Sequence, residues 1–339
     1  MEMAKRVNSA VTFTKQSKSR NKNSRSLLVY LSDFSTVLVA LVLFVFFGLT
    51  STYFFSTANL VNILKQMSVV GVLGVGMTMV ILIGGIDLSV GSVVLLSGAI
   101  TGTLVYNYSF SPWLATTIGL FAGIIVGLIN GLFVEKFGIS PVIVTLGTMI
   151  AVRGLGQAIL WINNSWVWVT NPFFITIAEG RILGFPIFAG IMIGLYILAF
   201  ILLKQTPFGR YIYAIGGNQW AAHLSGVPVQ RVKILAYVLC GLAASIAGIM
   251  TASRIGVVGP SVGNGMEFDA ITAVVLGGTS LSGGIGGVER TFLGTAILVM
   301  VLNYMTIRGI PGIWQAAVTG FLILIAVLID RLIRRRAEV

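Results

Sequence analysis

Charged residues are scarce in this sequence. Only 9% of the 339 residues are Asp, Glu, Lys or Arg, whereas 56% are hydrophobic. A soluble domain carries about 25% charged residues, so the composition excludes a water-soluble globule. The sequence instead predicts an all-α, polytopic membrane protein in contact with lipid.

Residue types needed for metal binding and common enzyme chemistry are nearly absent. The single cysteine, Cys240, excludes an internal disulfide, and with one histidine, His223, it cannot form a Cys/His metal cluster. No GxxxxGK[ST] string occurs, so the chain cannot itself be a P-loop ATPase. His223 lies in a polar loop, which disfavours an intramembrane hydrolase. We therefore expect no catalytic residue, no cofactor and no metal.

The positive charge is confined to three segments. Of the net +12, residues 1–25 carry +6, residues 204–233 carry +4 and residues 330–339 carry +2. The excess therefore forms no extended groove for nucleic acid. Lys and Arg beside membrane spans mark the cytoplasmic side, so the charge pattern is a prediction of topology.

Ten apolar segments approach the length of about 20 residues that a membrane-spanning helix needs. We predict spans at residues 29–49, 67–83, 90–106, 112–134, 140–162, 186–203, 234–253, 268–281, 291–307 and 313–329. The eighth is short. An even number of spans puts all three basic segments on one side, so both termini are predicted to be cytoplasmic and the aromatic loop 163–185 external.

This topology divides the chain into three parts. Residues 1–26 are expected to be a disordered basic cytoplasmic tail, residues 27–330 the transmembrane domain with a cytoplasmic loop at 204–233, and residues 331–339 a second basic tail. Within the domain, glycines 119, 123, 127 and 131 recur every four residues. Such a stripe predicts a close approach between two helices.

A few polar residues interrupt the apolar segments. The string GGIDLSVGS (residues 84–92) should separate two helices, with Asp87 accepting hydrogen bonds from the free amides near Ser89 and Val90. Broken segments also line substrate sites in transporters, so contact between Asp87 and a solute is the alternative.

Arg153 lies in the middle of a predicted span, where an unpaired charge costs at least about 2.5 kcal/mol. With Gln157 one turn further on, it could face a polar solute or satisfy carbonyls of a neighbouring broken helix. Three further amides are expected to form hydrogen bonds between helices, namely Asn130, Asn303 and Gln315. The candidates for a translocation path are Asp87, Arg153, Gln157, Asn130 and Asn303.

The most informative loop is residues 202–233. Asn218 should cap a short helix over residues 219–224, which Gly226 and Pro228 end. A short helix on the cytoplasmic surface would offer a contact to another protein, whereas a folded connector without a partner is the alternative.

Three strings carry a resemblance to a known family: GMTMVILIGGIDLSVGS (residues 76–92), TPFGRYIYAIGGNQWAAHLSGVPVQRVK (206–233) and EFDAITAVVLGGTSLSGGIG (267–286). The chain resembles the ribose-type branch of ABC-importer permeases, which includes ribose, galactoside, arabinose and xylose permeases. The resemblance implies a sugar permease subunit of the bacterial inner membrane. It also implies three partners: a separate ABC ATPase subunit, a periplasmic sugar-binding protein and a second permease copy.

In that family, a Gly-Asn-x-x-Ala-Ala-x-x-Ser-Gly segment forms the coupling helix that docks on the ATPase. The matching residues here are Gly217, Asn218, Ala221, Ala222, Ser225 and Gly226. We expect Ala222 to pack directly against the ATPase. The alternative function is an ion-coupled secondary transporter of a small polar solute, for which Asp87 alone could serve as the titratable group.

Overall fold

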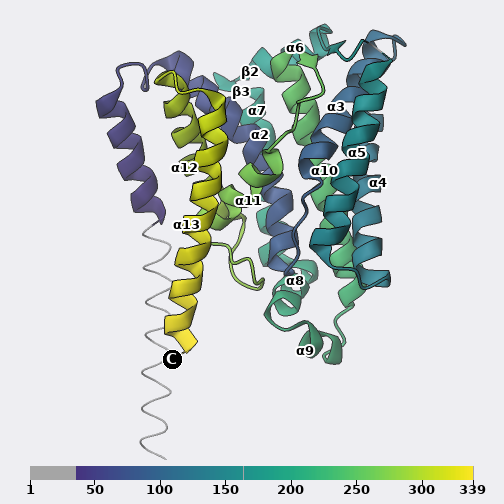
Figure 1. Cartoon of the computed structure of the whole chain (residues 1–339), viewed down its shortest axis with the longest axis vertical. Coiled ribbons are helices and arrows are strands. Elements are labelled where there is room, and N and C mark those ends of the chain that lie inside the picture. Colours follow the sequence, from purple (N-terminus) through teal and green to yellow (C-terminus); the bar gives the residue numbers. More distant parts are fainter. Residues whose placement is uncertain (1–35, 163, 339) are drawn as a thin grey trace, which may run out of the picture.

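The computed structural model describes residues 36–162 and 164–338 (Figure 1). The basic tail predicted for residues 1–26 lies outside the described residues. The main helices are Thr36–Thr50, α2 (Thr57–Leu82), α3 (Val90–Tyr106), α4 (Pro112–Lys136), α5 (Pro141–Trp161), α7 (Ile187–Gln205), α10 (Val229–Ile255), α11 (Met266–Leu276), α12 (Val288–Ile307) and α13 (Gly312–Glu338).

Shorter elements lie at the two ends of this bundle (Figure 1). The short helices are α6 (Pro172–Glu179), α8 (Pro207–Gly217) and α9 (Gln219–Leu224). Two antiparallel pairs of two-residue strands complete the fold. They pair β1 (Val167–Trp168) with β4 (Val257–Val258) and β2 (Arg181–Ile182) with β3 (Phe185–Pro186).

Each of the ten apolar segments predicted from the sequence contains part of one helix, but several boundaries differ. Helix α10 begins at Val229 rather than at residue 234, and α13 continues to Glu338 rather than ending at residue 329. The second helix begins at Thr57 rather than at residue 67. The eighth, α11, has 11 residues and ends at Leu276, because the glycine-rich residues 277–287 leave the helix. Six of the described helices are long and apolar enough to cross a bilayer, so the count of ten spans stays a prediction.

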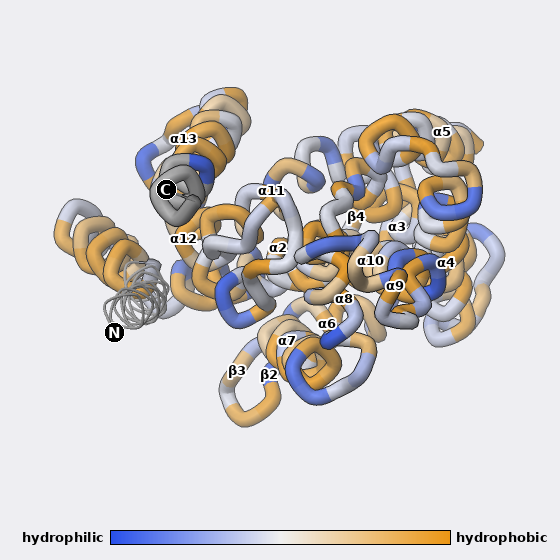
Figure 2. Tube along the Cα trace, turned by 90° about the horizontal axis from the view of Figure 1, so that it is seen from below, coloured by the Kyte–Doolittle hydropathy of each residue, from blue (hydrophilic) through white to orange (hydrophobic). Residues whose placement is uncertain are grey.

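Helices α2 and α10 form the centre of the bundle, and Figure 2 shows α4 and α5 on one side of them and α13 on the other. Within the most apolar window of 18 residues in each helix, 78% of the residues of α2 are buried, compared with 22% of the residues of α5. Because an α-helix that is apolar all round must be covered by protein or by lipid, α2 is a core helix. Most of the surface of α5 is left uncovered by the rest of this chain.

The glycine stripe of α4 packs against α10 and α3, as the four-residue spacing predicted. A Cβ on Gly127 would collide with the Tyr237 backbone of α10, and Gly123 and Gly241 face each other with their backbones in contact. Such contact excludes even a methyl group, so the spacing of the two helices depends on these glycines.

Gly127→Ala should therefore destabilise the protein. An overpacked contact costs about 1 to 3 kcal/mol, which we expect to appear as a lower melting temperature and a lower yield in detergent. The matched control is Gly147→Ala in α5, where nothing lies within 4 Å of the added methyl group. That variant should be at least as stable as the wild type because alanine favours the helix. Equal melting temperatures for the two variants would contradict the role of the stripe.

Different short helices lie at the two ends of the bundle. Helices α8 and α9 lie at the same end as the C-terminal end of α13, and α6 lies at the opposite end (Figure 1). The basic 204–233 segment therefore lies on the same side of the bundle as the end of α13. That this end faces the cytoplasm stays a prediction.

Candidate functional site

The 204–233 loop folds into two consecutive helices, α8 and α9. The Asn218 side chain caps α9, its Oδ1 accepting from the Ala221 amide at 3.0 Å. Gly226, at φ +81°, turns the chain after α9 and so adopts a conformation that other residues rarely reach. The short helix predicted over residues 219–224 is confirmed.

The exposed surface of α9 is apolar at two positions. Trp220 is 72% exposed and Leu224 64% exposed, on a helix that lies at one end of the bundle (Figure 1). Ala222, by contrast, is only 5% exposed within this one chain. This burial leaves little surface for the direct contact with the ATPase that the sequence suggested, and that contact stays a prediction. The chain turns after α9 toward the start of α10. The Val227 amide donates to the Ala222 carbonyl at 3.1 Å and closes this turn.

Lys233 ties α9 to the rest of the bundle. Lys233 Nζ, at the start of α10, lies 2.5 Å from Glu135 Oε1 at the end of α4, and both side chains are largely buried. The same ammonium donates to Gln219 Oε1 in α9 at 3.1 Å. One lysine thus joins α4, α9 and α10, so a displacement of α9 would pull on both long helices.

Helix α8 has its own attachment to the bundle, through the loop that precedes α12. Burial raises the pKa of Tyr213, so its hydroxyl keeps the proton that it donates to the Gly286 carbonyl at 2.9 Å. Lys204 lies 5.5 Å from the centre of the Tyr213 ring and forms an ion pair of 2.9 Å with Glu289 of α12. These contacts fasten α8 to α7 and α12.

A backbone junction completes this attachment. Gly216 of α8 lies against the Leu82 carbonyl and against Gly284, and the Gly284 amide donates to the Leu82 carbonyl at 2.9 Å. Leu82 is the last residue of α2. Helix α8 therefore touches the end of the central core helix, with no side chain between the backbones.

Asp87 and Asn130, two of the candidates for a translocation path, belong to one enclosed cluster. Asp87 Oδ1 accepts from the Ser89 amide at 2.9 Å and from the Ser89 hydroxyl at 2.6 Å. Asn130 of α4 donates to the Ser89 hydroxyl at 2.9 Å. All three residues are at most 1% exposed. The predicted bond from the Ser89 amide to Asp87 is confirmed, and the cluster fastens the break between α2 and α3 to α4.

Arg153 reaches a backbone carbonyl, one of the two alternatives that its position left open. Its Nη1 donates to the Val262 carbonyl at 3.4 Å, in the loop before α11. Glu267, a buried carboxylate at the start of α11, attracts this guanidinium. Gln157, one turn further along α5, is exposed. The guanidinium therefore holds the loop that leads into α11.

Asn303 and Gln315 form hydrogen bonds between helices, as expected. Asn303 of α12 and Asn59 of α2 exchange two amide hydrogen bonds, of 2.9 and 3.1 Å. Gln315 of α13 donates to Thr306 of α12 at 3.1 Å. Of the five candidates for a path, only Asp87 and Asn130 lie together, and the structure does not bring all five into one site.

A cavity of about 810 Å³ lies elsewhere, between α11 and α13. Its lining includes Asp269, Gln315 and Thr319, of which the sequence analysis singled out only Gln315 as an intramembrane amide. Tyr213 and Asp269 are two further residues that the sequence analysis did not single out, although both lie within the strings that resemble the sugar permeases. Neither spacing nor composition indicated which residues they would meet.

The comparison with known proteins rests on the same part of the chain that forms the bundle. Residues 59–327 match the model of a family described as the permease component of the branched-chain amino acid transport system. The chain belongs to this permease family. This permease is therefore a multi-pass membrane protein, in agreement with its apolar helices.

Among curated proteins, the chain is similar to permeases of sugar transporters. The permease is 41% identical over 290 residues to the ribose import permease protein RbsC of Bacillus subtilis, covering 86% of this chain and 90% of that protein. It is 37% identical to the L-arabinose ABC transporter permease protein AraH of Azospirillum brasilense, with coverages of 87% and 86%.

A third relative is the fructose import permease protein FrcC of Rhizobium meliloti, 36% identical with coverages of 89% and 85%. No solved structure matches the chain. The resemblance to ribose-type permeases of ABC importers is thus confirmed.

Proposed function

We propose that this permease supplies half of the translocation path of an ABC importer and moves a monosaccharide across the bacterial inner membrane by alternating access. It performs no covalent chemistry. The single observation that carries the proposal is α9, a capped helix with an exposed tryptophan and leucine at the end of a bundle whose relatives are named as sugar import permeases.

Three partners follow from this function. A separate ABC ATPase supplies the energy and docks on α9, where Trp220 and Leu224 give an apolar contact. A periplasmic sugar-binding protein delivers the sugar to the opposite end, and a second permease copy supplies the other half of the path. The choice of sugar rests largely on the binding protein.

The contacts of α8 and α9 provide the means to transmit the ATPase motion. Lys233 links α9 to α4 and α10, and the junction of Gly216, Gly284 and Leu82 links α8 to α2. Packed elements move as units rather than deform continuously. A shift of α9 would therefore reach the central helices and rock them around the path.

ATP-driven uptake in reconstituted vesicles tests the proposal against the ion-coupled alternative. Vesicles that contain the permease, its ATPase and its binding protein should take up a labelled pentose or hexose when ATP is present, and should continue after the proton and sodium gradients are dissipated. Uptake without ATP that stops with the gradients would establish a secondary transporter and overturn the proposal.

Topology is tested by thiol labelling. Cys240 is buried, so cysteines introduced as Trp220→Cys and Asn171→Cys can be compared with little background. We expect an impermeant reagent applied to intact cells to label Asn171→Cys and to reach Trp220→Cys only after the membrane is opened. Labelling of both positions from outside would contradict the proposed orientation.

A further inference from the structure

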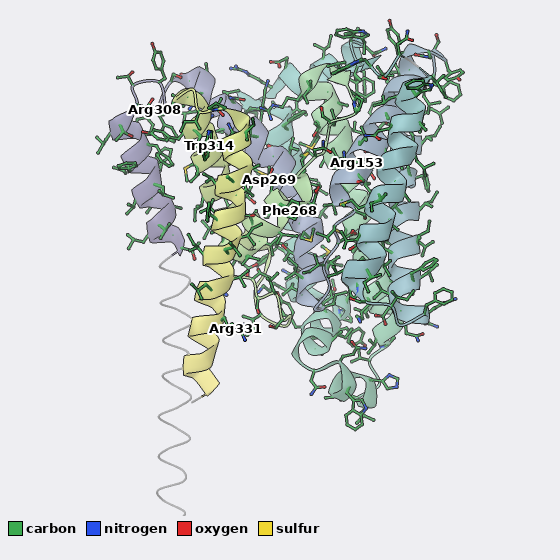
Figure 3. The ribbon with its side chains drawn as sticks, in the orientation of Figure 1. Arg153, Phe268, Asp269, Arg308, Trp314 and Arg331 are labelled. Atoms are coloured by element: carbon green, nitrogen blue, oxygen red, sulfur yellow. The ribbon has the colours of Figure 1, made fainter. Side chains whose placement is uncertain are left out.

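The cavity between α11 and α13 combines polar and aromatic side chains at a depth where lipid would surround a single chain. It is lined among others by Asn264, Phe268, Asp269, Gln315, Thr319 and Phe321. Figure 3 shows Phe268 and Asp269 within the helical bundle, away from both of its ends. Its volume of about 810 Å³ falls within the range of about 300 to 1,000 Å³ that is usual for small-molecule sites.

We propose that this cavity is the site through which the translocated sugar passes, an inference that rests on the proposed function. An ionisable residue at membrane depth faces either the interior of a bundle or a water-filled cavity. Asp269 faces this cavity, where one long hydrogen bond of 3.4 Å from Thr319 leaves most of its acceptor capacity unused.

The chemistry of the lining fits a neutral polyhydroxylated ring. The Asp269 carboxylate accepts from sugar hydroxyl groups, and the amides of Asn264 and Gln315 both donate and accept. The Phe268 ring is 49% exposed and the Phe321 ring 66% exposed, so each can cover the C–H face of a sugar. Pockets for small polar molecules combine aromatic surface with a few such polar groups in this way.

The charges of the lining exclude an anionic ligand. In the described part of the chain, no ion pair joins Asp269 to a lysine or arginine, and no basic residue lines the cavity. A phosphorylated sugar would bring two negative charges close to this carboxylate in a medium of low dielectric constant. The site therefore selects uncharged sugars over their phosphates.

Arg153 donates to the Val262 carbonyl, in the same loop as Asn264 of the cavity lining. On the open side of the cavity, contact between its polar lining and lipid would be unfavourable. We place the second permease copy there, which the proposed function already requires.

The first test is uptake of labelled D-ribose by vesicles that contain the complete importer. Asp269→Asn and Phe268→Ala should lower uptake at least tenfold, while the ATPase activity stimulated by the loaded binding protein stays within about twofold of the wild type. The matched control is Phe121→Ala, which removes a ring of similar exposure from α4, outside the cavity. It should transport like the wild type.

The second test works even if those variants assemble poorly. In the full complex, Gln315→Cys should react with a small polar thiol reagent, and millimolar D-ribose should slow the reaction at least threefold while ribose 5-phosphate leaves it unchanged. Ile325→Cys, on α13 but outside the cavity lining, should show no protection by either compound.

The outcomes are distinguishable. The site assignment is overturned if Asp269→Asn and Phe268→Ala both take up D-ribose like the wild type, or if D-ribose does not slow the labelling of Gln315→Cys. In either case, transport by the wild-type importer leaves the proposed function standing. Wild-type vesicles that take up none of a panel of pentoses and hexoses would overturn the proposed function, and the site assignment with it.

Discussion

Replacing Trp220 by glutamate should abolish ATP-driven sugar uptake by the reconstituted importer while leaving the permease folded. Trp220 is 72% exposed on α9, so its removal leaves no cavity in this chain. A buried aromatic anchor at an interface contributes at least about 2 kcal/mol, which is roughly a thirtyfold change in docking. A carboxylate in the same contact would add the cost of desolvating a charge.

Uptake and sugar-stimulated ATPase activity measure this effect, beside size-exclusion chromatography of the permease as a check of folding. The matched control is Trp220→Phe, which keeps an aromatic ring at the same position and should retain most of the activity. Full uptake and full stimulation in Trp220→Glu would remove α9 as the coupling element and favour the secondary transporter.

Adding one methyl group at Gly284 should prevent a movement of α8 and α9 from reaching the central helices of the permease. Gly284 has φ +73°, and a Cβ there would lie 2.8 Å from the Gly217 nitrogen and 2.9 Å from the Gly216 carbonyl carbon. Backbone atoms cannot move aside as a flexible side chain can, so Gly284→Ala should force α8 away from the end of α2. We expect uptake to fall at least tenfold even where the ATPase still binds.

The matched control, Gly309→Ala, distinguishes the effect of this collision from the effect of backbone strain alone. Gly309 also has a positive φ, of +70°, but nothing lies within 4 Å of the added methyl group. Both variants carry the cost of about 1 to 2 kcal/mol for a left-handed alanine, and only Gly284→Ala has the collision. Similar uptake by the two variants, with the ATPase bound in both, would show that the junction does not transmit the motion.

The sequence by itself determined the features that depend on neighbouring residues. Asn218 and Gly226 delimit α9 because a cap and a left-handed turn involve groups only a few residues apart. The glycine stripe of α4 was readable because helical spacing places every fourth residue on one face. The scarcity of charge likewise indicated a membrane protein without any knowledge of the partners of each helix.

Only the tertiary structure decided which distant groups meet. It buried Ala222, directed Arg153 to the Val262 carbonyl, and placed Thr319 beside Asp269, 50 positions earlier in the chain. It also broke α11 after 11 residues, so the loop before α12 could reach α2 and α8. A polar residue within an apolar segment must find a partner, but local spacing does not specify that partner, because it depends on how all the helices pack together.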